Sequence, residues 1–172
     1  MVRNDSKNRI YRYNRRVQGK TNYHQRLKLI KSKIPRCIIR KSNNGMLVQI
    51  ASYNLKGDHI TTAARAQDLI GLGYTLHTGN ISAAYLTGLL AGTRAIKAGI
   101  KDDVIIDFGL QKIQYGNRLF ASVKGLIDSG LHVRVGEGVF PAEERINGEH
   151  LSSKDAKSVI EKTKKAIEGG KK

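Results

Sequence analysis

The stretch of residues 81–98 constrains the fold more than any other part of the chain. Its only strongly polar side chains, Arg94 and Lys97, lie three residues apart on one side of the helix that this composition favours. Most of the circumference of that helix is apolar or small, so the helix must be largely buried. Small residues recur along it every four positions, namely Ala84, Gly88 and Gly92. We expect this spacing to let the helix approach a neighbouring helix or a sheet closely.

Three strand-like segments precede this helix. Residues 36–42, 46–53 and 59–65 are joined by short turns, and residues 43–45 (Asn-Asn-Gly) tolerate the positive φ of a hairpin turn. They predict an antiparallel meander, followed by a short helix at residues 66–72.

Two further strands and a helix are predicted after the helix at residues 81–98. Residues 104–108 are an apolar run interrupted only by Asp107, residues 118–129 fit an amphipathic helix, and residues 131–135 fit another strand. A strand, a helix and a strand at this spacing imply a right-handed parallel crossover. The predicted fold class is therefore α/β, with a mixed sheet packed by helices.

The chain divides into three predicted parts. Residues 1–34 form a basic arm with a short helix, residues 35–138 form the α/β core domain, and residues 139–172 form a C-terminal extension. In the extension, Ser152 and Asp155 resemble a capping box before an amphipathic helix. The apolar stripe of that helix consists of Ala156, Val159, Ile160, Thr163, Ala166 and Ile167.

Basic residues are concentrated near the N-terminus. The first 44 residues hold fourteen of the 31 Lys and Arg but one acid, Asp5, so most of the net charge of +17 lies there. A segment that is too polar to fold alone and carries this charge is typical of an arm that binds a polyanion. We expect the segment up to Gly19 to be disordered and to become ordered on binding. The alternative is a solvated basic tail.

A short helix is predicted after this segment. Tyr23, Leu27 and Ile30 lie at helical spacing behind Thr21 as the capping residue, and the helix ends before Pro35. Its apolar stripe is expected to face the domain and its basic face the partner.

Tyrosines alternate with cations through the arm and this helix. Planar rings stack on bases or riboses while neighbouring cations pair with phosphates, so RNA is favoured over DNA as the partner. The expected RNA-binding residues here are Arg9, Tyr11, Arg12, Tyr13, Arg15, Arg16, Lys20, Tyr23, Arg26, Lys28 and Lys31.

Turns of the core domain are further candidates for RNA contact. Residues 109–117 leave the carboxyl end of a strand and enter a helix, the position at which open α/β sheets usually bind ligands. Lys112, Asn117 and Arg118 lie there, and cations at a helix N-terminus favour phosphate. Residues 78–80, before another helix, form a weaker candidate for a phosphate cradle. The tip of the first hairpin offers Lys41, Asn43 and Asn44. The alternative for each segment is an ordinary turn.

The order of the predicted elements is also that of a ribonuclease H-like domain, so a metal-dependent nuclease is the enzyme alternative. Such a site needs several carboxylates around two divalent ions. Asp107 is suitably placed, but residues 36–42 and 81–98 contain no acid. We expect Asp107 to bind loop amides at the end of its strand instead.

Other classes of function find little support in the sequence. The single cysteine, Cys37, lies in an apolar run, which excludes a disulfide framework and predicts a buried thiol. The five histidines do not recur at the spacing of metal ligands. No apolar run reaches the roughly 18 residues of a membrane span. We therefore expect a cytoplasmic protein with no cofactor, no metal and no membrane partner.

Four blocks of the sequence resemble one protein family. They are GKTNYHQRL at residues 19–27, TGNISAAYLTGLLAG at residues 78–92, NRLFASVKG at residues 117–125 and PAEERINGEH at residues 141–150. In this order they resemble the archaeal and eukaryotic type of the large-subunit ribosomal protein family numbered eighteen in the universal naming. The last block is the most specific, because bacterial relatives end before it.

This resemblance implies a structural RNA-binding protein and not an enzyme. Family members bind 5S ribosomal RNA and anchor it to the large-subunit ribosomal RNA in the central protuberance, beside the ribosomal protein numbered five. Their N-terminal arm runs between RNA surfaces, and the matching segment here is residues 9–31. The resemblance thus adds Thr21 and Asn22 to the expected RNA-binding residues.

Overall fold

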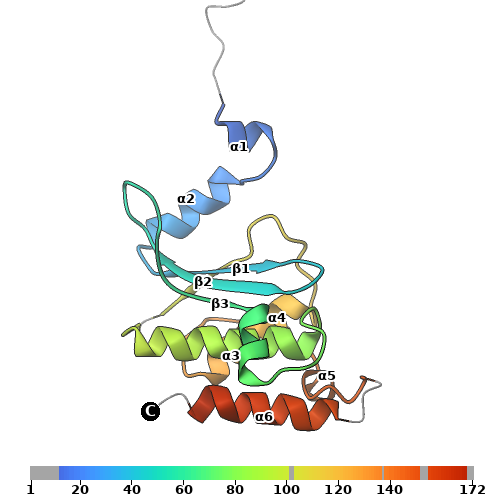
Figure 1. Cartoon of the computed structure of the whole chain (residues 1–172). Coiled ribbons are helices and arrows are strands. Elements are labelled where there is room, and N and C mark those ends of the chain that lie inside the picture. The colour runs from blue at the N-terminus through green and yellow to red at the C-terminus, as the bar shows by residue number, and fades with distance from the viewer. Residues whose placement is uncertain (1–11, 101–102, 137, 152–154, 170–172) are drawn as a thin grey trace, which may run out of the picture.

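A four-stranded mixed sheet lies at the centre of the protein. The computed structural model describes residues 12–100, 103–136, 138–151 and 155–169, and the strand order is β3-β2-β1-β4 (Figure 1). The strands are β1 (Arg36–Lys41), β2 (Met46–Ser52), β3 (His59–Arg65) and β4 (Ile105–Asp107). The first three form the predicted antiparallel meander, and β4 pairs in parallel with β1. The predicted α/β class with a mixed sheet is confirmed.

One face of the sheet is apolar because buried residues alternate along its strands. Ile39 of β1 and Val48 and Ile50 of β2 are fully buried, whereas Ile38 on the opposite face is half-buried. Cys37 is buried on the apolar face, as predicted. Burial, with Asp107 nearby, raises the pKa of its thiol, so Cys37 is an unreactive core residue.

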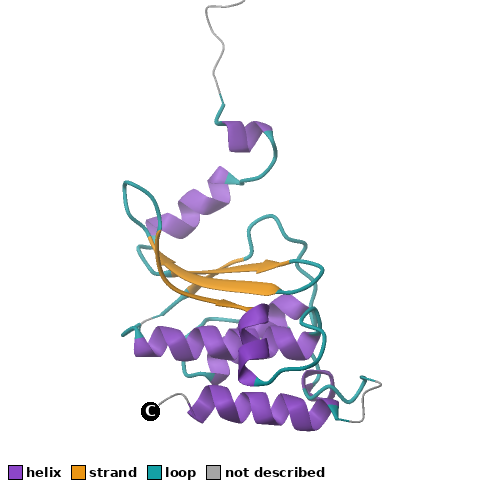
Figure 2. Ribbon diagram, in the orientation of Figure 1, coloured by secondary structure: helices purple, strands orange, loops and turns teal. Residues whose placement is uncertain are grey.

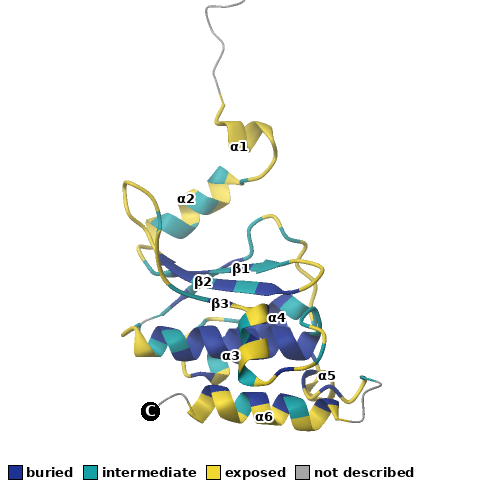
Figure 3. Cartoon of the chain, in the orientation of Figure 1, coloured by how far each residue is buried: buried dark blue, intermediate teal, exposed yellow. Residues whose placement is uncertain are grey.

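Helices cover this apolar face in two layers. α3 (Ile81–Lys97) lies between the sheet and α6 (Ala156–Gly169), and α4 (Arg118–Asp128) lies beside α3 (Figures 1 and 2). Figure 3 shows α3 as almost wholly buried, as its composition predicts. A Cβ atom on Gly88 would collide with the carbonyl oxygen of Ser122 on α4. The predicted close approach of α3 through its small residues is therefore confirmed.

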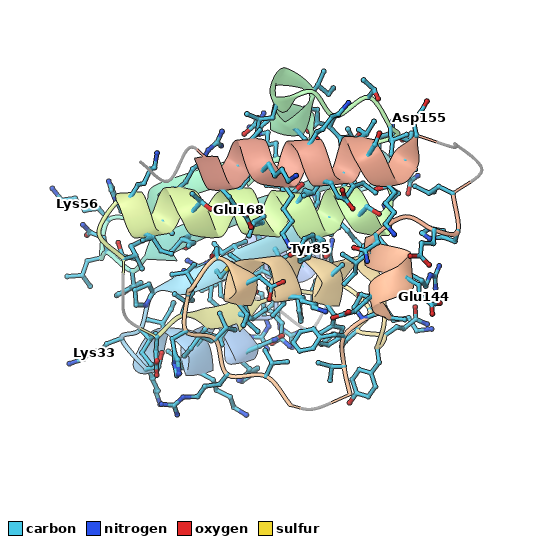
Figure 4. All side chains as sticks on the ribbon, turned by 90° about the horizontal axis from the view of Figure 1, so that it is seen from below. Lys33, Lys56, Tyr85, Glu144, Asp155 and Glu168 are labelled. Atoms are coloured by element: carbon cyan, nitrogen blue, oxygen red, sulfur yellow. The ribbon has the colours of Figure 1, made fainter. Side chains whose placement is uncertain are left out.

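The predicted C-terminal amphipathic helix is α6. Its buried residues, Ala156, Ile160, Thr163 and Ile167, belong to the predicted stripe. Figure 4 shows Tyr85 between α3 and α4, where its hydroxyl donates a hydrogen bond of 2.8 Å to Asp128. The capping box predicted at Ser152 lies outside the described residues. Within the described ranges, no helix is both long and apolar enough to cross a membrane.

The remaining helices are short. α1 (Asn14–Val17) and α2 (Tyr23–Lys31) lie across the sheet from α3 (Figure 1). The 3-10 helix η2 (Ala66–Leu72) forms where a short helix was predicted, and α5 (Glu143–Ile146) precedes α6.

The strand predicted at residues 131–135 does not form. Val133 alone bridges Val104, in the predicted parallel direction. Beyond this bridge the chain turns towards the loop that follows β4, where the Gly116 N–H donates to the Val139 carbonyl. The second strand of the expected crossover is therefore reduced to a single residue.

The first hairpin turns without the positive φ expected at residues 43–45. Its connection is four residues long, residues 42–45, and is closed by a hydrogen bond of 2.9 Å from the Ser42 N–H to the Gly45 carbonyl. A connection of this length does not require the left-handed backbone of a two-residue turn.

Three expectations for the arm are wrong. Residues 14–17, expected to be disordered, form the helical turn α1. Asn22, and not Thr21, caps α2, because its side chain accepts the Gln25 N–H at 3.2 Å. Leu27 is 53% exposed instead of facing the domain, since Arg26 occupies the inward position.

Candidate nucleic-acid interface

A chain of ion pairs links the arm to the sheet. Arg36 is buried, and its guanidinium nitrogens lie 2.6 Å from a carboxylate oxygen of Asp58 and 3.3 Å from one of Asp107. Asp58 also pairs with Arg26 of α2 at 2.8 Å, and Asp107 pairs with Arg40 at 3.3 Å. Burial alone would raise the pKa of Asp58, but hydrogen bonds from Arg36 and Arg26, and their charges, hold it below its ordinary value of 3.8. These pairs fix the position of α2 on the sheet.

Asp107 serves structure in this network. Its carboxylate accepts the N–H of Gly109 at 2.8 Å, so the predicted bond to a loop amide is confirmed. Arg36 and Arg40 hold the same carboxylate, which the sequence analysis did not anticipate. Among the described residues, no group of three or more His, Cys, Asp or Glu could hold a metal ion. The geometry therefore gives the nuclease alternative no support.

A basic pocket of about 140 Å³ lies between the arm and the sheet and is called here the arm pocket. Its cations are Arg15, Lys20, Arg26 and Arg40. Arg26 and Arg40 pair with Asp58 and Asp107, carboxylates that buried Arg36 also shares, whereas neither Arg15 nor Lys20 has an ion-pair partner in the described part of the chain. Arg15 instead donates to the Thr21 hydroxyl at 3.0 Å, which orients its guanidinium. The pocket can thus offer at least two free positive charges to an anion.

Two tyrosines of the arm form an exposed aromatic pair. The ring centroids of Tyr13 and Tyr23 lie 5.3 Å apart with an interplanar angle of 35°. Tyr13 is 74% exposed, so one face of the pair is open to stacking by a base. The cations of α1 flank this pair along the chain.

A second basic hollow, called here the tip groove, lies beside the tip of the first hairpin, where Lys41 ends β1. It has a volume of about 400 Å³, and its lining comes from the first hairpin, the N-termini of α3 and α4, and the C-terminal extension. The lining residues are Lys41, Gly79, Asn80, Ile81, Gly116, Asn117, Arg118, Arg145 and His150. The sequence analysis gave three separate candidate segments, at residues 41–44, 78–80 and 109–118. All three contribute residues to this groove.

Arg118 holds these segments together. One of its guanidinium nitrogens donates to the carbonyls of Gly79 at 2.7 Å, Ser42 at 3.2 Å and Asn43 at 3.4 Å. The Thr78 hydroxyl adds a bond of 2.5 Å to the Asn44 carbonyl. Arg118 thus carries a structural role in addition to its positive charge.

The loop of residues 109–117 forms a ridge between the two basic hollows. Its first residues line the arm pocket and its last residues line the tip groove. Leu110, Ile113 and Tyr115 on this ridge are each more than half exposed, and Lys112 is exposed beside them. Aromatic and apolar side chains between two basic hollows suit contact with a nucleic acid, whose charged backbone alternates with planar bases.

Comparison with known proteins gives the family. Residues 7–104 match the family described as "Ribosomal large subunit proteins 60S L5, and 50S L18". The chain is 40% identical over 146 residues to "Large ribosomal subunit protein uL18" of Methanoregula boonei, which covers 85% of this chain and 83% of the relative. It is 46% identical over 138 residues to the protein of the same name from Natronomonas pharaonis, covering 80% of this chain and 74% of the relative. The chain belongs to the uL18 family. As a member of the uL18 family, it is a protein of the large ribosomal subunit, and the resemblance to this family that the sequence indicated is confirmed.

The predicted RNA-binding residues of this uL18 family member fall into several groups. The arm pocket brings together Arg15, Lys20, Thr21, Asn22 and Arg26. The tip groove brings together Lys41, Asn117 and Arg118. Exposed positions outside both hollows are held by Arg12, Tyr13, Arg16, Lys28, Lys31, Asn43, Asn44 and Lys112, while Tyr23 is half-buried. Arg9 and Tyr11 lie outside the described residues. For all of these residues, contact with RNA stays a prediction.

Two arginines and one histidine of these hollows were not predicted from the sequence. The position of Arg40 could have been predicted from the sequence. Side chains alternate between the two faces of a strand, so Arg40 must lie on the face opposite the buried Ile39. Arg145 and His150 lie in the block at residues 141–150 that carries the family resemblance, but no local pattern shows that this block returns to the hairpin tip. Only the fold brings them to the tip groove.

Proposed function

We propose that this protein binds 5S ribosomal RNA and anchors it to the large-subunit ribosomal RNA in the central protuberance of cytoplasmic ribosomes, beside the ribosomal protein numbered five. It acts as a structural protein and not as an enzyme. The observation that carries the proposal is that partly buried ion pairs join a basic, aromatic arm to a uL18 core. We further propose the division into an arm at residues 1–34, a core at residues 35–138 and an extension at residues 139–172.

The arm binds RNA by two kinds of contact. Cations of residues 9–31 pair with phosphates, and Tyr13, stacked on Tyr23, receives a base or ribose on its open face. The Arg26–Asp58 pair holds α2 beside the sheet before RNA arrives. A prepositioned arm loses less conformational freedom on binding than a free tail.

Competition binding tests this proposal. Labelled 5S ribosomal RNA is titrated with the full chain and with a chain lacking residues 1–20, against a duplex and a transfer RNA as competitors. We expect the full chain to prefer 5S ribosomal RNA, and the shortened chain to bind at least about tenfold more weakly, because phosphate contacts dominate RNA affinity. Every described residue from 12 to 20 is exposed, so the shortened chain should keep the thermal stability of the full chain. Equal affinity of the full chain for all three RNAs would contradict the proposal.

A further inference from the structure

The C-terminal extension brings Arg145 and His150 to the tip groove. Arg145 belongs to α5 and His150 follows it, and both are exposed where they line the groove. α5 itself is fixed to the core, since Ile146 is buried and the Ser82 hydroxyl on α3 donates to the Arg145 carbonyl at 3.4 Å. The position of Arg145 at the groove is therefore set by the fold.

The positive charge of the tip groove is not neutralised. No ion pair with a described carboxylate involves Lys41, Arg118, Arg145 or His150, and no described residue that lines the groove is acidic. By contrast, two of the four cations in the arm pocket are paired with acids. A concentration of unpaired cations in one hollow favours an anionic ligand.

Two helices begin at the groove and add to this field. Asn80 caps α3 by accepting the Ala83 N–H at 2.6 Å, and Asn117 caps α4 by accepting the Leu119 N–H at 2.8 Å. The N-terminus of a helix carries a partial positive charge, which favours anions and above all phosphate. The helix ends reinforce the charges of Lys41, Arg118 and Arg145 and do not make the site alone.

The tip groove and the arm pocket lie within reach of one RNA molecule. Gly109 lines the arm pocket and Gly116 lines the tip groove, and the seven residue-to-residue steps from one to the other span at most about 25 Å. The exposed side chains of the ridge lie between them. An RNA strand held by the arm can therefore cross the ridge and enter the groove.

We propose that the tip groove binds a phosphate of the RNA backbone, and that the C-terminal extension thereby forms a second RNA-binding surface with the hairpin tip. This inference rests on the proposed function and assigns the extension a role within it. Guanidinium groups match phosphate by paired hydrogen bonds, so Arg145 supplies the most specific contact, and Lys41 supplies a point charge. Arg118, whose guanidinium is held by three carbonyls, contributes charge alone.

Paired charge variants of the full chain test the groove. Lys41→Gln with Arg145→Gln removes two positive charges from the groove, and Lys162→Gln with Lys165→Gln removes two from the exposed surface of α6 as the matched control. The probe is a 5S ribosomal RNA transcript over a range of salt concentrations. We expect the groove variant to bind about tenfold more weakly and to reduce the slope of log affinity against log salt by about 1.4 to 1.8, while the control stays close to wild type. Arg145→Gln with His150→Gln, which leaves β1 unchanged, should weaken binding in the same direction.

The results separate this inference from the proposed function. If the wild type binds the transcript, an Arg15→Gln and Arg16→Gln variant is weakened, and both groove variants equal the control, RNA does not occupy the groove and the inference alone is overturned. An acidic segment of a neighbouring protein would then be the remaining class of ligand. If the wild type does not prefer the transcript to a duplex, both fail.

Directed cleavage gives a second readout that does not depend on affinity. Because Cys37, the one cysteine, is fully buried, a surface cysteine can be labelled alone. An iron chelate tethered at His150→Cys should cleave the bound transcript at one discrete site, and the same chelate at Lys165→Cys should not. Cleavage from position 165 but not from position 150 would overturn the inference.

Discussion

At the residue scale, Gly88 shows how closely α3 and α4 pack. A Cβ atom there would collide with the backbone carbonyl of Ser122, which belongs to a buried helix and cannot easily move. Helix propensity favours Ala over Gly by about 1 kcal/mol, but overpacking a core costs about 1 to 3 kcal/mol or more. We therefore expect Gly88→Ala to lower the free energy of unfolding by about 2 kcal/mol in chemical denaturation. Gly71→Ala, where a Cβ meets nothing within 4 Å, is the control, and equal stability of the two variants would show that the helices separate freely.

Residue-level features were predictable where spacing along the chain determines them. The four-residue spacing that includes Gly88 predicted a close approach to a neighbouring helix or to the sheet, because helix periodicity is a property of the sequence alone, but it did not identify α4 as the partner. The capping residue of α2 was misassigned to Thr21, since Asn22 is an equally good cap and the choice depends on where the helix begins. The orientation of Arg26 was not predictable, because Asp58 lies 32 residues away in the chain.

At the scale of elements, the Arg26–Asp58 pair decides where α2 lies. α2 contains no buried residue, so apolar packing holds it weakly. Asp58→Asn should speed amide hydrogen exchange in residues 23–31 and lower the free energy of unfolding by about 2 kcal/mol, as buried Arg36 loses a charged partner. Glu143→Gln, which removes a carboxylate that is 83% exposed in its pair with Lys124, is the control and should change neither measurement. Unchanged exchange in the Asp58 variant would show that other contacts position α2.

The pairs of Asp58 with Arg36 and Arg26 make part of the stability depend on pH. The pKa of Asp58 is below its ordinary value of 3.8 in the folded protein, so the folded state favours the ionised carboxylate. Its contribution is complete above the ordinary pKa and is lost as pH falls through the lower, folded pKa. The difference in stability between wild type and Asp58→Asn should therefore be constant near neutral pH and shrink below about pH 4, as followed by denaturation across pH. A difference that grows on acidification would contradict this assignment.

The sequence predicted most elements but not how all of them pair. The meander, α3, α4 and α6 follow from periodicity and turn residues, which are local signals. Residues 131–135 have the composition of a strand, but only Val133 finds a partner, because the rest of the segment leaves the sheet for the loop after β4. The tip groove was unpredictable for the same reason. The three segments that line it were each recognised as candidates in the sequence. That they lie together, and that Arg145 lies beside them, depends on the tertiary structure.

At the scale of the whole molecule, the structure reduces the number of arm cations available to phosphate. Arg9, Arg12, Arg15, Arg16, Lys20, Lys28 and Lys31 remain candidates, while Arg26 is paired with Asp58. Seven phosphate contacts predict that log affinity of the arm for RNA falls against log salt with a slope of about −5 to −6. A polycation without ordered contacts would give a similar slope, so charge alone does not test how the arm binds.

The tyrosines distinguish these two modes of binding. Tyr11→Ala with Tyr13→Ala should weaken binding to 5S ribosomal RNA by about 1 to 3 kcal/mol for each lost stack, without changing the salt slope, because stacking releases no counterions. The discrimination between 5S ribosomal RNA and a duplex should shrink as well, since a duplex offers no splayed bases. Tyr11→Phe with Tyr13→Phe keeps the rings and is the matched control, expected to bind as wild type does. If the alanine variant also binds both RNAs like the wild type, the exposed pair of Tyr13 and Tyr23 is a packing contact within the arm, and the arm binds by charge alone.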